Sequence, residues 1–89
     1  MTPNEFHIQN KNGIYLFASV HCGKCSEQKE KMKNVKHVVV ECDIDPEFLY
    51  KTYRVDLIPC VRVYKDNLVV YEKLLVMNDK ELEHLKTYE

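Results

Sequence analysis

The feature that most constrains this chain is a Cys-Gly-Lys-Cys motif, in which two residues separate Cys22 from Cys25. An apolar run at residues 14–18 leads into the motif, and a strongly charged stretch at residues 26–36 follows it. The first pattern is typical of a buried strand and the second of an exposed helix. The two thiols are therefore expected where a strand ends and a helix begins. Free backbone N–H groups and the helix dipole favour a thiolate at such a junction.

Length and composition limit what can surround this motif. The chain has 89 residues, so we expect one domain with a single modest core, covering residues 1–89. The formal net charge of -1 gives no electrostatic reason to expect a nucleic-acid partner. No apolar stretch approaches the roughly 18–20 residues of a membrane span, so no membrane partner is expected. The first residues lack the pattern of a signal peptide, which favours a cytoplasmic, reducing location.

The rest of the chain alternates between predicted helices and strands. Helices are expected to start at Thr2, Asp45 and Asn78, because each is a capping residue followed by proline or by glutamate in the first turn. The β-branched run at residues 38–44 predicts a strand that is parallel to the first strand and buried on both faces. Turn residues at 65–67 predict a hairpin. The expected order is α-β-α-β-α-β-β-α, with elements at residues 2–10, 14–18, 23–34, 38–44, 45–54, 60–64 and 68–74, and a last helix from residue 78.

The four cysteines fall into two kinds. Cys22 and Cys25 have a motif spacing, whereas Cys42 and Cys60 each lie in a strand-like apolar run and are expected to be buried. A purely structural pair, or half of a zinc site, is the alternative for the motif. A zinc site would need two further ligands from Cys42, Cys60 and His21, and the chain has no second close ligand pair. We therefore expect no metal.

Beyond the motif, the chain resembles thioredoxins. The resemblance rests on the Cys-Gly-Lys-Cys segment and on residues 43–47, 53–59 and 63–66, and it covers roughly residues 14–87. The first strand that thioredoxins usually have is missing. The resemblance implies a thioredoxin-like α/β fold with a four-stranded mixed sheet and helices on both faces. It also implies a small thiol–disulfide oxidoreductase that reduces protein disulfides.

The motif itself assigns roles to the two thiols. Cys22, at the helix start and the more exposed, is expected to attack a substrate disulfide, and Cys25 to resolve the mixed disulfide. Gly23 keeps the spacing, and Lys24 adds a positive charge beside Cys22. The redox centre is then the Cys22–Cys25 disulfide, and no bound cofactor is expected.

The resemblance adds a substrate site. It implies that the bond between Ile58 and Pro59 is cis, that it lies against the dithiol, and that the Ile58 backbone pairs with an extended substrate segment. Thioredoxins place a glycine at about Leu75, so the docking groove is expected to differ in shape.

Four further positions depart from the thioredoxin pattern. Leu16 stands where a buried aspartate is usual, and Glu41 stands where a lysine is usual. We hypothesise that Glu41 is the buried acid that assists proton transfer at Cys25; a solvated glutamate at a strand edge is the equal alternative. His21 stands where a tryptophan is usual. It is expected either to modulate Cys22 by titrating near neutral pH or to be only an exposed residue on the rim. Lys24 replaces a proline, which predicts a weaker reductant, with a potential of roughly -200 to -260 mV.

The resemblance also implies the partners. These are protein disulfide substrates and an electron donor, either a thioredoxin reductase or a glutathione system, and the protein is expected to be a monomer. A glutaredoxin-like reductant is one alternative, which the sequences at residues 57–59 and 75–78 disfavour. A non-catalytic module that senses redox state through partner binding is another. Cys60 follows Pro59 directly, so it is either a third thiol near the pair or a small buried hydrophobe.

Overall fold

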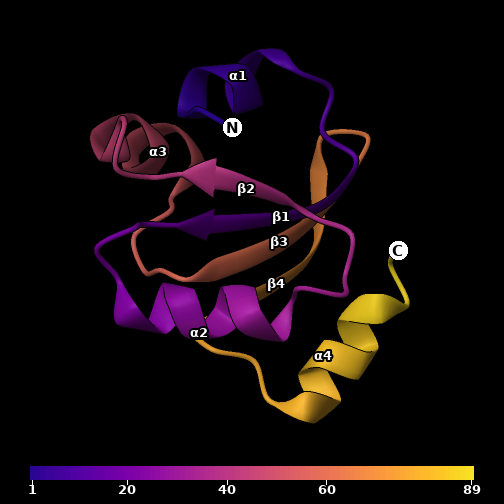
Figure 1. The fold of residues 1–89 in the computed structure, drawn as a ribbon. Helices are drawn as coiled ribbons and strands as arrows, with labels where there is room; N and C mark the ends of the chain where they lie inside the picture. The colour runs from indigo at the N-terminus through magenta and orange to yellow at the C-terminus, as the bar shows by residue number, and fades with distance from the viewer.

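The computed structural model describes all residues from Met1 to Glu89 and has the predicted order of elements (Figure 1). Helices and strands alternate until a final hairpin and helix. The elements are α1 (Pro3–Ile8), β1 (Gly13–Ala18), α2 (Gly23–Lys31), β2 (Val38–Glu41), α3 (Pro46–Tyr53), β3 (Cys60–Lys65), β4 (Leu68–Leu74) and α4 (Asp79–Lys86).

Side-chain caps fix where three of the helices begin. The side chains of Thr2 and Asn78 each accept a hydrogen bond from a backbone N–H three residues on. In return, the carboxylates of Glu5 and Glu81 accept from the backbone N–H of Thr2 and Asn78. Asp45 caps α3 in the same way, ahead of a proline at the first helical position. These bonds satisfy backbone donors that the first turn leaves free, so the three predicted starts are confirmed.

The four strands form one mixed sheet in the order β2-β1-β3-β4. β1 and β2 are parallel, which agrees with the helical crossover between them, and the β1–β3 and β3–β4 pairs are antiparallel. The β3–β4 turn places Asp66 and Asn67 at φ values of 51° and 69°, the left-handed conformation of a tight hairpin turn. The predicted hairpin is therefore confirmed.

Helices cover both faces of this sheet, and each face has its own core. In Figure 1, α2 and α4 lie on one side of the strands and α1 and α3 on the other. Ten buried residues form the core on the α2 and α4 side, among them Leu16, Cys25 and Met32. Nine form the core on the opposite side, among them Phe17 and Cys60. No helix is long and apolar enough to span a bilayer.

The structure corrects the prediction for the second strand. β2 ends at Glu41 rather than at residue 44, and it is an edge strand rather than one buried on both faces. Only Val40 is fully buried, while Val38 and Glu41 are exposed. A run of β-branched residues reports strand propensity, but the position of the strand within the sheet depends on tertiary pairing.

Two predicted helices are shorter than expected. α1 ends at Ile8, and α2 ends at Lys31, where Met32 leaves the helical conformation with ψ near 6°. A turn then follows in which the Val35 N–H donates to the Met32 carbonyl at 2.9 Å. Met32 and Val35 are both buried in the core beside α2, so their packing turns the chain back toward the sheet.

Candidate active site: the dithiol at the start of α2

Cys22 is the capping residue of α2. Its side-chain sulfur accepts a hydrogen bond from the Cys25 N–H at 3.2 Å, and its carbonyl accepts from the Ser26 N–H at 3.3 Å. Cys22 is partly exposed, whereas Cys25, one turn along, is fully buried. The sulfur of Cys22 therefore takes the position that Ser, Thr or Asp occupies in ordinary helix caps, where a negative charge is favoured.

The loop that brings Cys22 to this position is held by Asp43. One carboxylate oxygen accepts from the Ser19 hydroxyl at 2.6 Å, and the other accepts from the Val20 N–H at 3.0 Å. The Ser19 hydroxyl oxygen accepts in turn from the His21 N–H at 3.1 Å. These bonds, with the Ser19 hydroxyl first, hold the pKa of Asp43 below its ordinary value. Asp43 thus stays ionised and fixes the segment between β1 and α2.

Cys25 is a poor acid in this environment. Burial raises the pKa of the Cys25 thiol to about 11, and a side-chain hydrogen bond with Cys22 adds to the rise. The backbone N–H of Ser19 and the charge of Lys29 act in the opposite direction on this pKa. Cys25 is therefore a thiol near neutral pH, and its thiolate needs help to form.

The other two cysteines lie on the opposite face of the sheet. Cys42 and Cys60 belong to the core under α1 and α3, whereas Cys25 belongs to the core under α2. Burial raises the pKa of both Cys42 and Cys60 to about 12. Cys60 is thus a buried residue rather than a third thiol of the site.

The same arrangement bears on the zinc alternative. A zinc site would require two of His21, Cys42 and Cys60 to converge on the motif, but no three side chains of the metal-binding types come together. Four convergent ligands are needed for a structural zinc site.

The rest of the motif is open to solvent. Gly23 and Lys24 are exposed, and Lys24 lies 3.9 Å from Glu27 in a surface ion pair. His21 is exposed as well, on the rim of the site.

The segment before β3 supplies the other predicted site residues. The Ile58–Pro59 bond is cis, as the resemblance implies. Pro59 is buried, and Ile58 packs against the same core cluster as Cys22. The Pro59 carbonyl accepts from the Leu75 N–H at 2.7 Å, and Leu75 has a φ of 66°. This left-handed conformation explains why a glycine suits the position in thioredoxins.

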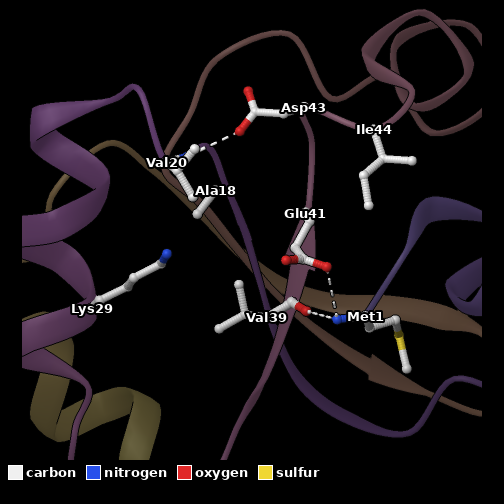
Figure 2. A pocket seen from close by; sticks show the side chains of 8 residues that line it. All are labelled: Met1, Ala18, Val20, Lys29, Val39, Glu41, Asp43 and Ile44. Atoms are coloured by element: carbon white, nitrogen blue, oxygen red, sulfur yellow. Dashed lines mark hydrogen bonds and ion pairs between the residues drawn. The ribbon is translucent and has the colours of Figure 1, made fainter.

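Glu41 is not the buried acid that we expected. Its side chain is 53% exposed and lies 3.6 Å from the N-terminal amino group of Met1. The Met1 amino group also donates to the Val39 carbonyl at 3.0 Å, as Figure 2 shows. β2 is an edge strand, so the side chain of its last residue reaches solvent. The expected burial of Glu41 is therefore wrong, and its alternative, a solvated glutamate at a strand edge, is correct.

A pocket of about 460 Å³ lies beside the site, between α2 and the ends of β1 and β2. Ala18 and Val39 line it from the strands, and Val20 lines it from the loop that leads to the motif. Lys29 points into it from α2, and Glu41 and Asp43 stand on its other side (Figure 2). The carboxyl ends of parallel strands are a common place for ligand sites in α/β sheets.

Gln28 and Lys29 of α2 were not among the predicted site residues. The pattern of α2 is unusually polar, and Gln28 is nevertheless fully buried. Its Oε1 accepts from the Met77 N–H at 2.9 Å, which links α2 to the segment before α4, and its Nε2 has no partner. Ser19 and Asp43 were missed as well. The available signal was a small polar residue directly after the first strand and an acidic residue two positions after the end of the second.

Comparisons with known proteins agree with the fold. No model of a known protein family matches the chain, and no curated protein matches it either. Among solved structures it is similar to a thioredoxin of Malassezia sympodialis, with a TM-score of 0.78 and 10% identity over 98% of this chain and 85% of that one. It is also similar to a Plasmodium falciparum thioredoxin, with a TM-score of 0.77 and 22% identity over 99% and 94%.

A Trypanosoma brucei brucei thioredoxin matches 99% of this chain and 85% of its own, with a TM-score of 0.73 and 17% identity. These identities are low, while the coverage is nearly complete in both directions. The predicted fold class, a four-stranded mixed α/β sheet flanked by helices, is confirmed. The chain has the thioredoxin-like fold.

Proposed function

We propose that this protein is a small thiol–disulfide oxidoreductase that reduces protein disulfides through Cys22 and Cys25. One observation carries the proposal: an accessible sulfur caps α2, and a fully buried thiol lies one turn along the same helix. The first sulfur has the exposure that an attacking thiolate needs. The second is protected from outside reagents and is close enough to Cys22 to replace a substrate on it.

The reaction has two steps. The Cys22 thiolate attacks one sulfur of the substrate disulfide, so a Cys22–substrate bond forms and the other substrate sulfur leaves as a thiolate. Cys25 then loses its proton and attacks Cys22. The Cys22–Cys25 bond forms, the second substrate thiolate leaves, and two electrons have passed from the dithiol to the substrate. No bound cofactor takes part.

The proposed docking site for the substrate is the rim beside Cys22. Ile58 precedes Pro59 there, and its backbone is the proposed partner of an extended substrate segment. Leu57, directly before Ile58, has an exposed apolar side chain, and so has Leu75, whose N–H bonds to the Pro59 carbonyl. Val20, before the motif, also exposes its side chain. A substrate with an apolar residue near its disulfide suits such a rim, because exposed apolar side chains favour burial on contact.

We further propose that the protein acts as a monomer in a reducing compartment. An external donor must return the Cys22–Cys25 disulfide to the dithiol after each cycle. A thioredoxin reductase and a glutathione system are the two candidate donors, and the choice between them is open to direct assay.

Turnover of a model disulfide tests the proposal. With dithiothreitol as donor, the protein should accelerate the reduction of insulin, and Cys22→Ser should abolish the acceleration. Cys25→Ser should instead accumulate a mixed disulfide at Cys22 that is visible by mass spectrometry. Cys60→Ala is the matched control, because Cys60 lies on the other face of the sheet. Wild-type protein without activity, or Cys22→Ser with full activity, would contradict the proposal; reversible oxidation without turnover would favour a redox-responsive binding module.

A further inference from the structure

The chain lacks the usual means of activating its buried thiol. Leu16 lies in the core under α2 with no exposed surface, where the resemblance leads one to look for an aspartate. Glu41 faces solvent and pairs with the N-terminal amino group. Cys25 nevertheless has to become a thiolate in the second step. Some other charge must therefore favour that thiolate.

Lys29 is in the right place for this task. It lies four residues after Cys25 on α2, so the two side chains leave the helix on the same face. Its side chain is half-buried and points into the pocket at the ends of β1 and β2 (Figure 2). All seven ion pairs of the molecule involve other groups, so Lys29 has no carboxylate partner within 4 Å. An unpaired ammonium in a recess acts more strongly on a nearby sulfur than one in open water.

The backbone N–H of Ser19 also favours the Cys25 thiolate, but it carries no net charge, and the other groups around Cys25 do not replace Lys29. A negative charge on Cys22 or Cys42 would repel the Cys25 thiolate, so neither cysteine can favour it. Asp43 also faces the pocket, and the charge of Lys29 helps to lower its pKa, but its two oxygens are bound to the Ser19 hydroxyl and the Val20 N–H and form no ion pair with Lys29. His21 is exposed beside Asp43, and the contact of α2 with the segment before α4 is made by the uncharged Gln28.

We propose that Lys29 is the positioning residue that stabilises the Cys25 thiolate while Cys25 displaces the substrate from Cys22. Cys25 gives up its proton to solvent, and the Lys29 ammonium stabilises the negative charge that is left on the sulfur. Cys25 then bonds to Cys22, the Cys22–substrate bond breaks, and the substrate thiolate carries away the electron pair. Once the disulfide has formed, the charge on Lys29 is again unpaired. This inference rests on the proposed function, and it assigns a residue to the second step only.

The two steps can be timed separately with the aromatic disulfide 5,5′-dithiobis(2-nitrobenzoate), used in amounts below that of the reduced protein. Attack by Cys22 releases one coloured thiolate, and attack by Cys25 releases the second. The second phase is intramolecular, so its rate should not depend on protein concentration. We expect Lys29→Gln to leave the first phase unchanged and to slow the second roughly tenfold near pH 7, the effect of about one pH unit in thiolate formation.

The pH profile separates an electrostatic role from a structural one. In Lys29→Gln the rate of the second phase should rise with pH along a curve displaced to higher pH, and it should approach the wild-type rate in strongly alkaline solution. Lys29→Arg, which keeps the charge, should restore the wild-type profile. Lys33→Gln changes the net charge equally beyond the end of α2 and should behave as wild type, since Lys33 pairs with Glu30.

Each outcome decides between the two proposals. A second phase in Lys29→Gln with the wild-type rate at every pH overturns the role of Lys29 and leaves the oxidoreductase intact. A wild-type protein that releases only one coloured thiolate contradicts Cys25 as the resolving thiol, and with it the proposed function. If Lys29→Arg is as slow as Lys29→Gln, the side chain acts through packing and the electrostatic role is wrong.

Discussion

The hydroxyl group of Ser19 donates a hydrogen bond of 2.6 Å to the carboxylate of Asp43. This bond joins the loop after β1 to the segment after β2, two parts of the chain that meet only in the folded protein. The Ser19 carbonyl also accepts from the Cys22 N–H at 3.3 Å. The position of the Cys22 sulfur therefore depends on the Asp43 carboxylate, which lies 21 residues further along the chain.

Ser19→Ala tests this dependence without removing the charge of Asp43. The Ser19 hydroxyl is the largest cause of the lowered pKa of Asp43, so this pKa should rise in the variant. A carbon-13 titration of the carboxyl group measures the change. Alkylation of Cys22 by iodoacetamide at pH 7.5 should slow severalfold, because a hydrogen bond that positions the loop is lost.

Ser26→Ala is the control for this experiment. Ser26 lies on the exposed side of α2 directly after Cys25, and its hydroxyl forms no hydrogen bond within the protein. The loop bond would have no role at the site if Ser19→Ala and Ser26→Ala reacted at the same rate.

Thiol reactivity should distinguish Cys22 from the other three cysteines. Cys25, Cys42 and Cys60 are buried, and their pKa values are raised to about 11, 12 and 12. A raised pKa lowers the thiolate fraction at pH 8, and burial blocks access. Mass spectrometry of the reduced, folded protein after brief treatment with iodoacetamide should show one adduct, located at Cys22. The same treatment in guanidinium chloride should give four, and two or more adducts in the folded protein would contradict the buried positions.

The buried thiols should make stability fall in alkaline solution. The unfolded chain releases thiol protons near pH 9, whereas Cys42 and Cys60 keep theirs to about pH 12 in the folded protein. The stability that each thiol contributes is therefore complete below pH 9 and is lost as the pH rises toward 12. The slope of the unfolding free energy is at most about 1.4 kcal/mol per pH unit for each thiol.

Cys60→Ala provides the comparison for alkaline unfolding. The variant should be less stable overall because it leaves a small cavity. The loss from the cavity is the same at every pH, so it does not affect the slope of the unfolding free energy against pH. Between pH 9 and 11 this slope, measured by urea unfolding at each pH, should be shallower than in the wild type. Parallel curves for the two proteins would rule out the contribution of Cys60.

Two ion pairs of equal length should differ in their effect on stability. Arg62 and Glu72 lie 2.6 Å apart with the Arg62 side chain only 8% exposed, and Lys51 and Glu47 lie 2.6 Å apart on the surface. Removing Glu72 leaves the Arg62 guanidinium buried without its carboxylate partner. We expect Glu72→Ala to lower the unfolding free energy by about 2 kcal/mol and Glu47→Ala by roughly 0.5 kcal/mol.

A double variant separates the pair from its surroundings. Arg62→Met with Glu72→Leu removes both charges, so it should be more stable than Glu72→Ala alone. Urea unfolding of the variants measures the differences. Equal losses for Glu72→Ala and Glu47→Ala would show that burial of Arg62 does not strengthen the pair.

The order of elements could be predicted because its signals are local. Capping at Thr2, Asp45 and Asn78 depends on side chains that bond to their own first turn, and these bonds are present in the structure. The hairpin between β3 and β4 was equally local. The Cys-Gly-Lys-Cys motif placed Cys22 at the start of a helix for the same reason.

Features that depend on tertiary placement could not be predicted in this way. The position of β2 at the sheet edge follows from strand order, and this edge position exposes Glu41. The face of Cys60 was readable in principle, since Val61 and Val63 alternate with it along β3 and belong to the other core. The position of Lys29 over the pocket depends on how α2 packs on the ends of β1 and β2, which no local pattern reports.

The sheet also separates Cys60 from the two cysteines of the motif. In the proposed reaction the pair at the start of α2 forms and breaks its disulfide in every cycle, while Cys60 lies on the opposite face of the hydrogen-bonded sheet. A disulfide between Cys60 and either cysteine of the motif would have to cross the sheet, so it would require the chain to unfold first. If peptide mapping detected such a disulfide, it would show that the molecule had unfolded at some earlier time.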